Sequence, residues 1–316
     1  MYVSAEDARS DVILAGAAAI FGPLLLTLVD GTPGLPRAGA PRVALDLAFA
    51  FAITGLVPLL LARYRRDLPG AFLLGPVRGA QRPRAQVTTG LVLALPIAVL
   101  GIVRGLAVVG ELGPAALGRI SAAALPAPVV GRTTFDVVGA LLAVATVVVL
   151  TLGALLLIGF VTVRGRDAFR QDDRSSTELL RTVGMGAAGL GLVLGLVRSI
   201  GSGSPLLAVL NALTLAAVVL LVDRQVPRGA TVPRAAVLTP AVLVVLLHVF
   251  AAGGLLGGGL VRGLQTGALA GGIALALAIL AEHRRSMLVA VPALVALAWW
   301  PSCLSPVPIL AGLSAC

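Results

Sequence analysis

The side chains of this sequence that could do chemistry are a few polar residues that interrupt long apolar runs. Asp46, Arg104, Arg198, Asn211 and His248 each lie within such a run or close to its end. A charged or titratable group is costly in an apolar environment, so its presence suggests a role in binding, proton transfer or internal pairing. We therefore treat these residues as the first candidates for a functional site.

Three arginines occupy similar positions. Each follows an aliphatic pair at or near one terminus of an apolar run. The segments are Ile-Val-Arg-Gly for Arg104, Leu-Val-Arg-Ser for Arg198 and Leu-Val-Arg-Gly for Arg262. One interpretation is that each side chain extends separately to the lipid headgroups. The other is that they converge as a binding site for a lipid phosphate or an anionic substrate. The shared surroundings also suggest a duplicated helical hairpin.

The remaining polar candidates are two carboxylates, an amide and an imidazole. Asp30 ends the first apolar run, and Asp46 lies about one helical turn inside the second. Asp46 could pair with one of the arginines, or serve as a base or cation ligand. His248 is either a hydrogen-bonded packing residue or a group for proton transfer or gating, because its side chain titrates near neutral pH. With Asn211, these residues predict a polar cavity that opens on one side of the protein.

Signatures of known catalytic chemistry do not occur. The sequence has no His-Glu-x-x-His zinc motif, no phosphate-binding glycine loop and no dinucleotide fingerprint. The two cysteines and two histidines are too scattered to suggest a metal site. We expect no metal and no cofactor, and the catalytic residues of any enzyme activity stay unknown.

Composition defines the elements that must position these residues. Hydrophobic residues make up 58% of the 316 residues, charged residues 12%, and the mean hydropathy is +1.03. A soluble protein carries roughly 25% charged residues, so most of this surface must face hydrocarbon instead of water. The apolar runs do not alternate with polar residues as membrane β-strands do. The composition therefore predicts an all-α, polytopic transmembrane helical bundle that forms one integral membrane domain over residues 1–316.

A helix needs about 20 apolar residues to cross a bilayer. Nine runs satisfy or approach this length, and the last of them is short and contains Pro292. They cover residues 12–29, 43–62, 87–109, 137–163, 182–198, 205–222, 235–256, 263–281 and 287–300.

The distribution of arginine predicts the orientation. The connections 63–86, 164–181, 223–234 and 282–286 hold 16 Arg, and the opposite side holds 7. Positive residues concentrate in cytoplasmic loops, so we expect a cytoplasmic N-terminus and, after nine crossings, an extracytoplasmic C-terminus. All 24 basic residues are Arg, which with abundant Ala and Gly suggests a high-GC bacterium and hence the bacterial cytoplasmic membrane. Because the arginines lie between apolar runs, the net charge of +10 indicates membrane lipids and not nucleic acid as the partner.

Cys303 and Cys316 lie in the C-terminal tail, just after Trp299 and Trp300. The Trp pair is typical of a membrane interface. An extracytoplasmic tail permits disulfide formation, so we predict a Cys303–Cys316 disulfide; the alternative is two unpaired thiols.

Small residues at intervals of four predict close helix packing. They form two stripes, at positions 263, 267 and 271 (all Gly) and at positions 187, 191 and 195 (Ala, Gly, Gly). We expect them to pack within the bundle in preference to a dimer interface. The segment from Arg164 to Arg181 mixes both charges and is expected to be a solvated connector, with Ser176 or Thr177 capping the helix that follows.

Three classes of function fit these observations. A transporter or permease-like protein with an outward-facing polar cavity is favoured by the number of helices and by prolines within them. A non-catalytic structural or assembly protein, with an unknown protein partner, needs no site. A lipid-linked transferase or hydrolase at the outer face would use Asp30 or Asp46 as a base. The partners expected are membrane lipids and a small-molecule or lipid substrate.

Overall fold

The computed structural model describes residues 3–30, 39–67, 70–74, 83–112, 137–169, 173–200, 204–252, 259–299 and 304–307. The predicted disulfide lies outside these residues, because neither Cys303 nor Cys316 is among them.

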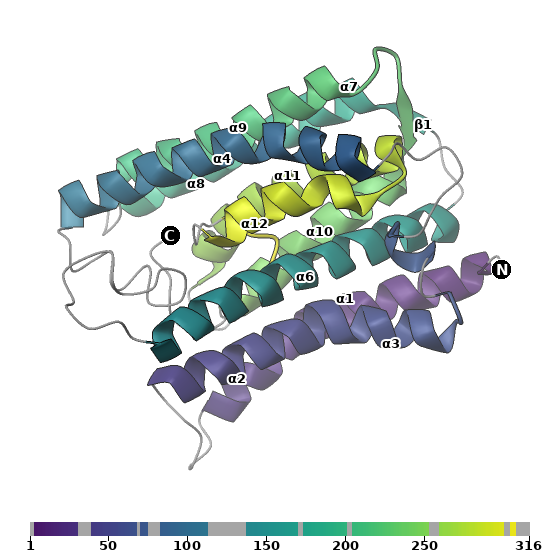
Figure 1. Ribbon diagram of the computed structural model, residues 1–316, viewed down its shortest axis with the longest axis horizontal. Helices are drawn as coiled ribbons and strands as arrows, with labels where there is room; N and C mark the ends of the chain where they lie inside the picture. The colour runs from purple at the N-terminus through teal and green to yellow at the C-terminus, as the bar shows by residue number, and fades with distance from the viewer. Residues whose placement is uncertain are drawn as a thin grey trace.

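The chain folds as a bundle of long helices whose axes lie roughly along one direction (Figure 1). Eight helices or helical stretches are long and apolar enough to cross a membrane, which confirms the prediction of an all-α polytopic bundle. The helices are α1 (Ala5–Asp30), α2 (Gly39–Phe51), α3 (Val57–Tyr64), α4 (Pro83–Leu112), α6 (Val137–Ala168), α7 (Ser176–Leu179), α8 (Met185–Ser199), α9 (Pro205–Gln225), α10 (Arg234–Ala251), α11 (Leu260–Arg284) and α12 (Val291–Trp299). Short helical turns lie at η1 (Ala52–Leu56), η2 (Gly70–Phe72), η4 (Leu180–Gly184) and η5 (Met287–Ala290).

The ninth predicted crossing is shorter than the other eight. The apolar helical stretch there runs from Met287 to Ala298, which at 1.5 Å per residue spans about 18 Å. The hydrocarbon core of a bilayer is about 30 Å thick. This stretch therefore reaches partway across, and the buried segment Leu304–Val307 follows it inside the bundle.

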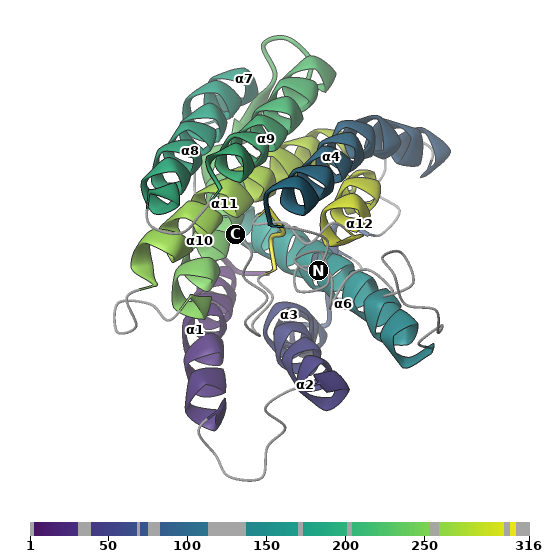
Figure 2. The ribbon, with the colours of Figure 1, turned by 90° about the vertical axis from the view of Figure 1, so that its left-hand side faces the viewer.

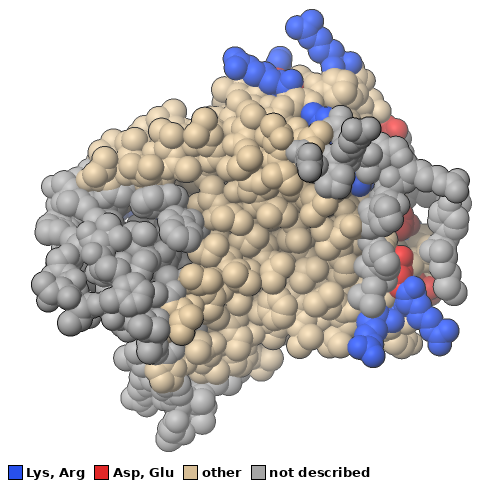
Figure 3. All heavy atoms as spheres, in the orientation of Figure 1, with Lys and Arg blue, Asp and Glu red and all other residues tan. Residues whose placement is uncertain are grey.

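The outer surface of the bundle is apolar. Large hydrophobic side chains such as Phe21, Leu106 and Leu141 are 60% or more exposed. Figure 3 shows a broad belt without charged residues, with the visible charged side chains gathered toward one end of the molecule. We call this the charged end; α1 begins there and α6 ends there (Figure 1). Such a continuous apolar belt is stable only against lipid.

Helix α11 occupies the centre of the bundle (Figures 1 and 2). Nearly all of its membrane-length stretch is buried, against α10, α8, α9 and α6. Its Ala and Gly residues allow this, because small side chains let several neighbouring backbones approach. A methyl group at Gly263 would meet the Cα atom of Val249 at 2.7 Å, and one at Gly267 would meet the carbonyl oxygen of Val245 at 3.0 Å.

The second small-residue stripe packs on the other side of α11. A methyl group added at Gly191 would lie 2.5 Å from a side-chain atom of Leu269 on α11. One added at Gly195 would lie 2.7 Å from the Cβ atom of Ala208 on α9. Both stripes therefore pack within the bundle, as the sequence predicts.

The stretch from Arg164 to Arg181 begins differently from the solvated connector that the sequence suggested. Helix α6 continues to Ala168, and Arg164 is fully buried within it. Strand β1 (Asp173–Ser175) then pairs antiparallel with β2 (Thr231–Pro233). The cap of α7 is Ser175, whose hydroxyl accepts a hydrogen bond from the Glu178 amide. The prediction of Ser176 or Thr177 as the cap was therefore wrong, by one position and by two positions respectively.

Candidate functional site

Helices α4 and α9 bring two of the predicted polar residues together. The Nη1 atom of Arg104 donates a hydrogen bond to Oδ1 of Asn211 at 3.1 Å. Asn211 is 3% exposed, so this bond lies within the bundle and not at its lipid-facing surface. The interpretation that Arg104 simply extends to the headgroups therefore does not describe this contact, because the guanidinium is held by a buried amide.

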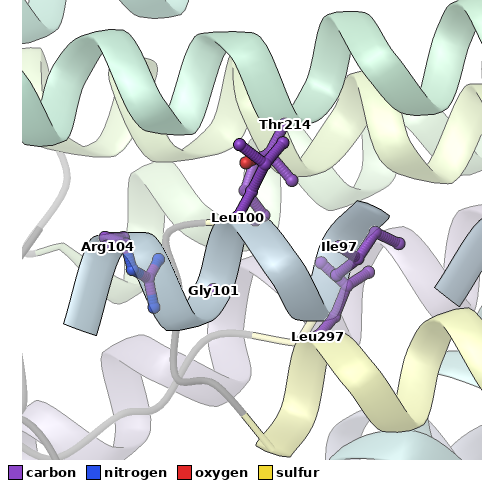
Figure 4. Close-up of a pocket in the computed structure, with 7 residues that line it drawn as sticks. Ile97, Leu100, Gly101, Arg104, Thr214 and Leu297 are labelled. Atoms are coloured by element: carbon purple, nitrogen blue, oxygen red, sulfur yellow. The ribbon is translucent and has the colours of Figure 1, made fainter. Parts of the chain in front are cut away.

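The Arg104 side chain also lines a narrow pocket between α4, α9 and α12 (Figure 4). Ile97, Leu100 and Gly101 form the α4 wall, Thr214 lies opposite on α9, and Leu297 and Leu304 come from α12 and the segment after it. The space open to a water-sized molecule is about 10 Å³, close to what one water molecule needs. In this conformation the pocket is too small for a substrate.

A second arginine is held in a similar way between α8 and α11. The Nη1 atom of Arg198 donates a hydrogen bond to Oε1 of Gln265 at 2.9 Å, and Gln265 is 3% exposed. Gly195 makes room for this amide, since a methyl group there would lie 2.7 Å from the Gln265 Nε2 atom. Arg262 lies one turn before Gln265 on α11, on the same helix face as the amide that Arg198 contacts.

Gln265 and Thr214 were missed by the sequence analysis. Both are uncharged residues in apolar runs, and Gln265 lies three residues after Arg262. A spacing of three residues places the side chains of Arg262 and Gln265 on one helix face. This spacing was the signal from which Gln265 could have been identified as a candidate site residue.

His248 is a buried residue with its hydrogen bonds made locally. Its Nδ1 atom is 2.8 Å from the carbonyl oxygen of Val244, one turn earlier in α10. The backbone of Ser305 lies within hydrogen-bonding reach of the same ring. Leu304, Ser305 and Val307 are each at most 5% exposed, so the segment Leu304–Val307 fills the bundle beside His248. These contacts match the packing interpretation of this histidine.

The two predicted carboxylates lie on α1 and α2. Asp46 lies on α2 and is 4% exposed, and α2 packs against α6. Asp30 is the last residue of α1, and its side chain lies outside the described part of the structure. Across the described residues, no three His, Cys, Asp or Glu side chains come together as a metal site.

Among the described residues, the largest cluster of ion pairs lies at the charged end, and it was not predicted. Arg164, fully buried on α6, forms ion pairs with Asp11 on α1 at 3.0 Å and with Asp67 at 3.2 Å. Arg65 pairs with the same Asp11 at 3.3 Å and with Asp7 at 2.6 Å. These five residues, which we call the ion-pair network, join the start of α1, the end of α3 and the end of α6. Asp7 and Asp11 are four residues apart in a helix, which places both carboxylates on one face.

Comparison of the chain with protein-family models, with curated proteins and with solved structures found no match. The site is therefore interpreted from its own geometry.

Proposed function

We propose that this chain is a permease-like protein that moves a small polar or anionic solute across a membrane, with its pathway opening on the side opposite the charged end. The observation that carries this proposal is the Arg104–Asn211 pair beside the narrow pocket between α4, α9 and α12. An arginine within a membrane-spanning stretch is costly. Its hydrogen bond to a buried amide supports a polar path through the interior of the bundle.

The pocket must widen for a solute to pass. One of its walls is formed by α12 and the segment that follows it. Helix α12 is nine residues long, and Leu304 belongs to the buried segment that follows it. Nonhelical backbone at membrane depth is stable where protein surrounds it or where it lines a cavity. Displacement of Leu304–Val307 would enlarge the pocket next to Arg104.

The other two classes of function have less support. A transferase that used Asp46 as its base would need that carboxylate at an open substrate site, yet Asp46 is 4% exposed. A purely structural protein needs no polar residues beside a pocket, although the closed pocket is compatible with it.

Water access to the pocket separates the transport and structural proposals. We would replace Cys303 and Cys316 by Ser and introduce a single cysteine as Thr214→Cys or Leu213→Cys. Thr214 lines the pocket, whereas the adjacent Leu213 is 51% exposed on the lipid-facing surface of the same helix. Thiols react with membrane-impermeant methanethiosulfonates as thiolates, which require water.

A permease that opens toward the side opposite the charged end predicts that Thr214→Cys reacts from that side and that Leu213→Cys does not. Reaction at neither position would support a closed structural bundle and reject the transport proposal. Equal reaction at both would indicate a loosened fold instead of a defined pathway.

A further inference from the structure

Two arginines lie around the buried Gln265 amide at the end of the bundle opposite the charged end: Arg198 donates a hydrogen bond to it, and Arg262 lies one helical turn before it on α11. Arg198 is in the last turn of α8 and Arg262 is in the first turn of α11, and both side chains are partly exposed. Both are cations, and the contact of Arg198 with Gln265 brings its charge to the face of α11 that carries Arg262. Within the described residues, no carboxylate forms an ion pair with either arginine. Two nearby positive charges raise the free energy of the folded protein unless a bound anion neutralises them.

Neighbouring residues on α8 and α11 hold the Arg198 side chain in place. Its Nη1 atom is fixed by the buried Oε1 atom of Gln265 at 2.9 Å. The Gln265 amide in turn fits against α8 because position 195 is Gly. One of the five guanidinium donors is used by this bond, so the others stay available to a ligand. Arg262, three residues before Gln265, lies on the same face of α11.

We propose that Arg198 and Arg262 form a binding site for a phosphate group, with Gln265 as the residue that positions Arg198. Planar guanidinium groups bind phosphate oxygens through paired N–H donors, and two of them can neutralise one phosphodiester or phosphomonoester. The site is at a helix end, where a lipid headgroup or a phosphorylated solute from the aqueous phase can reach it. It does not depend on the transport proposal, because Arg104 and the pocket are not part of it.

The test uses the purified full-length chain and two kinds of probe, phospholipids and inorganic phosphate. Binding of phosphatidylglycerol and of phosphatidylcholine is counted by native mass spectrometry after detergent exchange. Inorganic phosphate is added separately, and its effect on thermal stability is measured. The variants are Arg198→Gln, Arg262→Gln, the double variant, and Gln265→Met, which keeps the volume of the side chain. Arg228→Gln is the matched control, because Arg228 is an exposed arginine between α9 and β2.

The phosphate site predicts that each Arg→Gln change weakens phosphatidylglycerol binding by about tenfold and the double change by about a hundredfold. Gln265→Met is expected to have a smaller effect, and Arg228→Gln none. Stabilisation of the wild type by inorganic phosphate, lost in the double variant, would identify an aqueous phosphate compound as the ligand instead of a lipid.

The proposal would be overturned if the wild type and the double variant bind phosphatidylglycerol equally and inorganic phosphate stabilises neither or both to the same extent. If the glutamine variants aggregate, Arg198→Lys with Arg262→Lys retains both charges and tests the same site. Lysine lacks the planar fork, so this variant should still bind more weakly than the wild type, and unchanged binding would overturn the proposal.

Discussion

Replacement of Arg164 should destabilise the protein far more than replacement of an exposed arginine. Arg164 is fully buried, and its guanidinium contacts two carboxylates, Asp11 at 3.0 Å and Asp67 at 3.2 Å. It also lies 5.2 Å from the centre of the Phe160 ring. Arg164→Ala leaves the fully buried Asp11 with Arg65 as its remaining described partner, and it removes a cation from a network of three carboxylates and two arginines.

The expected magnitude follows from the burial of the pair. Removal of one partner of a buried ion pair costs about 3–5 kcal/mol, because the other charge stays buried without its partner. The control is Arg181→Ala, since Arg181 pairs with Asp223 at 3.1 Å but its side chain is 68% exposed. Such exposed pairs contribute about 0–1 kcal/mol. The two variants therefore remove the same side chain from two different environments.

The assay is reversible denaturation in mixed detergent micelles, followed by circular dichroism, with thermal unfolding as a second measurement. We expect Arg164→Ala to lower the free energy of unfolding several-fold more than Arg181→Ala does. A second variant, Arg164→Met with Asp11→Leu, removes both charges and should recover part of the loss. Equal effects of Arg164→Ala and Arg181→Ala would refute the reasoning, because they would show that burial of the network contributes nothing measurable.

Two further predictions concern packing and a hydrogen bond at the charged end. Gly263→Ala should cost about 1–3 kcal/mol, because the new methyl group would lie 2.7 Å from the Cα atom of Val249. The control is Gly189→Ala, whose new methyl group has no atom within 4 Å. This change should be neutral or stabilise α8 by about 0.5–1 kcal/mol. The same denaturation assay compares the two variants, and equal losses of stability would contradict the packing of α11 on α10. Ser176→Ala removes the 2.8 Å hydrogen bond between the Ser176 hydroxyl and Nε2 of His283, and should cost about 1 kcal/mol. A stability unchanged by Ser176→Ala in that assay would indicate that water replaces the hydroxyl.

The sequence predicted the features that depend on length and on local spacing. Apolar runs identify membrane-length helices because hydrocarbon thickness sets a minimum length. The glycines at 263, 267 and 271 were assigned to helix packing because a repeat of four residues places them on one face. The short stretch Met287–Ala298 was marked in advance by its length and by Pro292.

The contacts between helices were harder to predict. Helices α6 and α9 are apolar all around, so their sequences do not mark which face points inward. Arg164 was therefore assigned to a solvated connector, although its helix continues past it and buries it against Asp11. The Arg104–Asn211 bond joins residues 107 positions apart. Such a pair depends on how α4 and α9 are placed relative to each other, which one sequence does not determine.

The central claim is that the helices of this bundle cross a membrane. The most direct test measures from which side of the membrane a thiol reagent reaches a single introduced cysteine, in a chain from which Cys303 and Cys316 have been removed. Ile200→Cys lies at the end of α8, where Ile200 is 88% exposed, and Arg228→Cys lies beyond α9 at the charged end. A membrane-spanning bundle with its charged end in the cytoplasm predicts that an impermeant thiol reagent labels Ile200→Cys in intact cells and Arg228→Cys only after permeabilisation. Labelling of both from the same side would contradict the account, because α9 would then not cross the membrane.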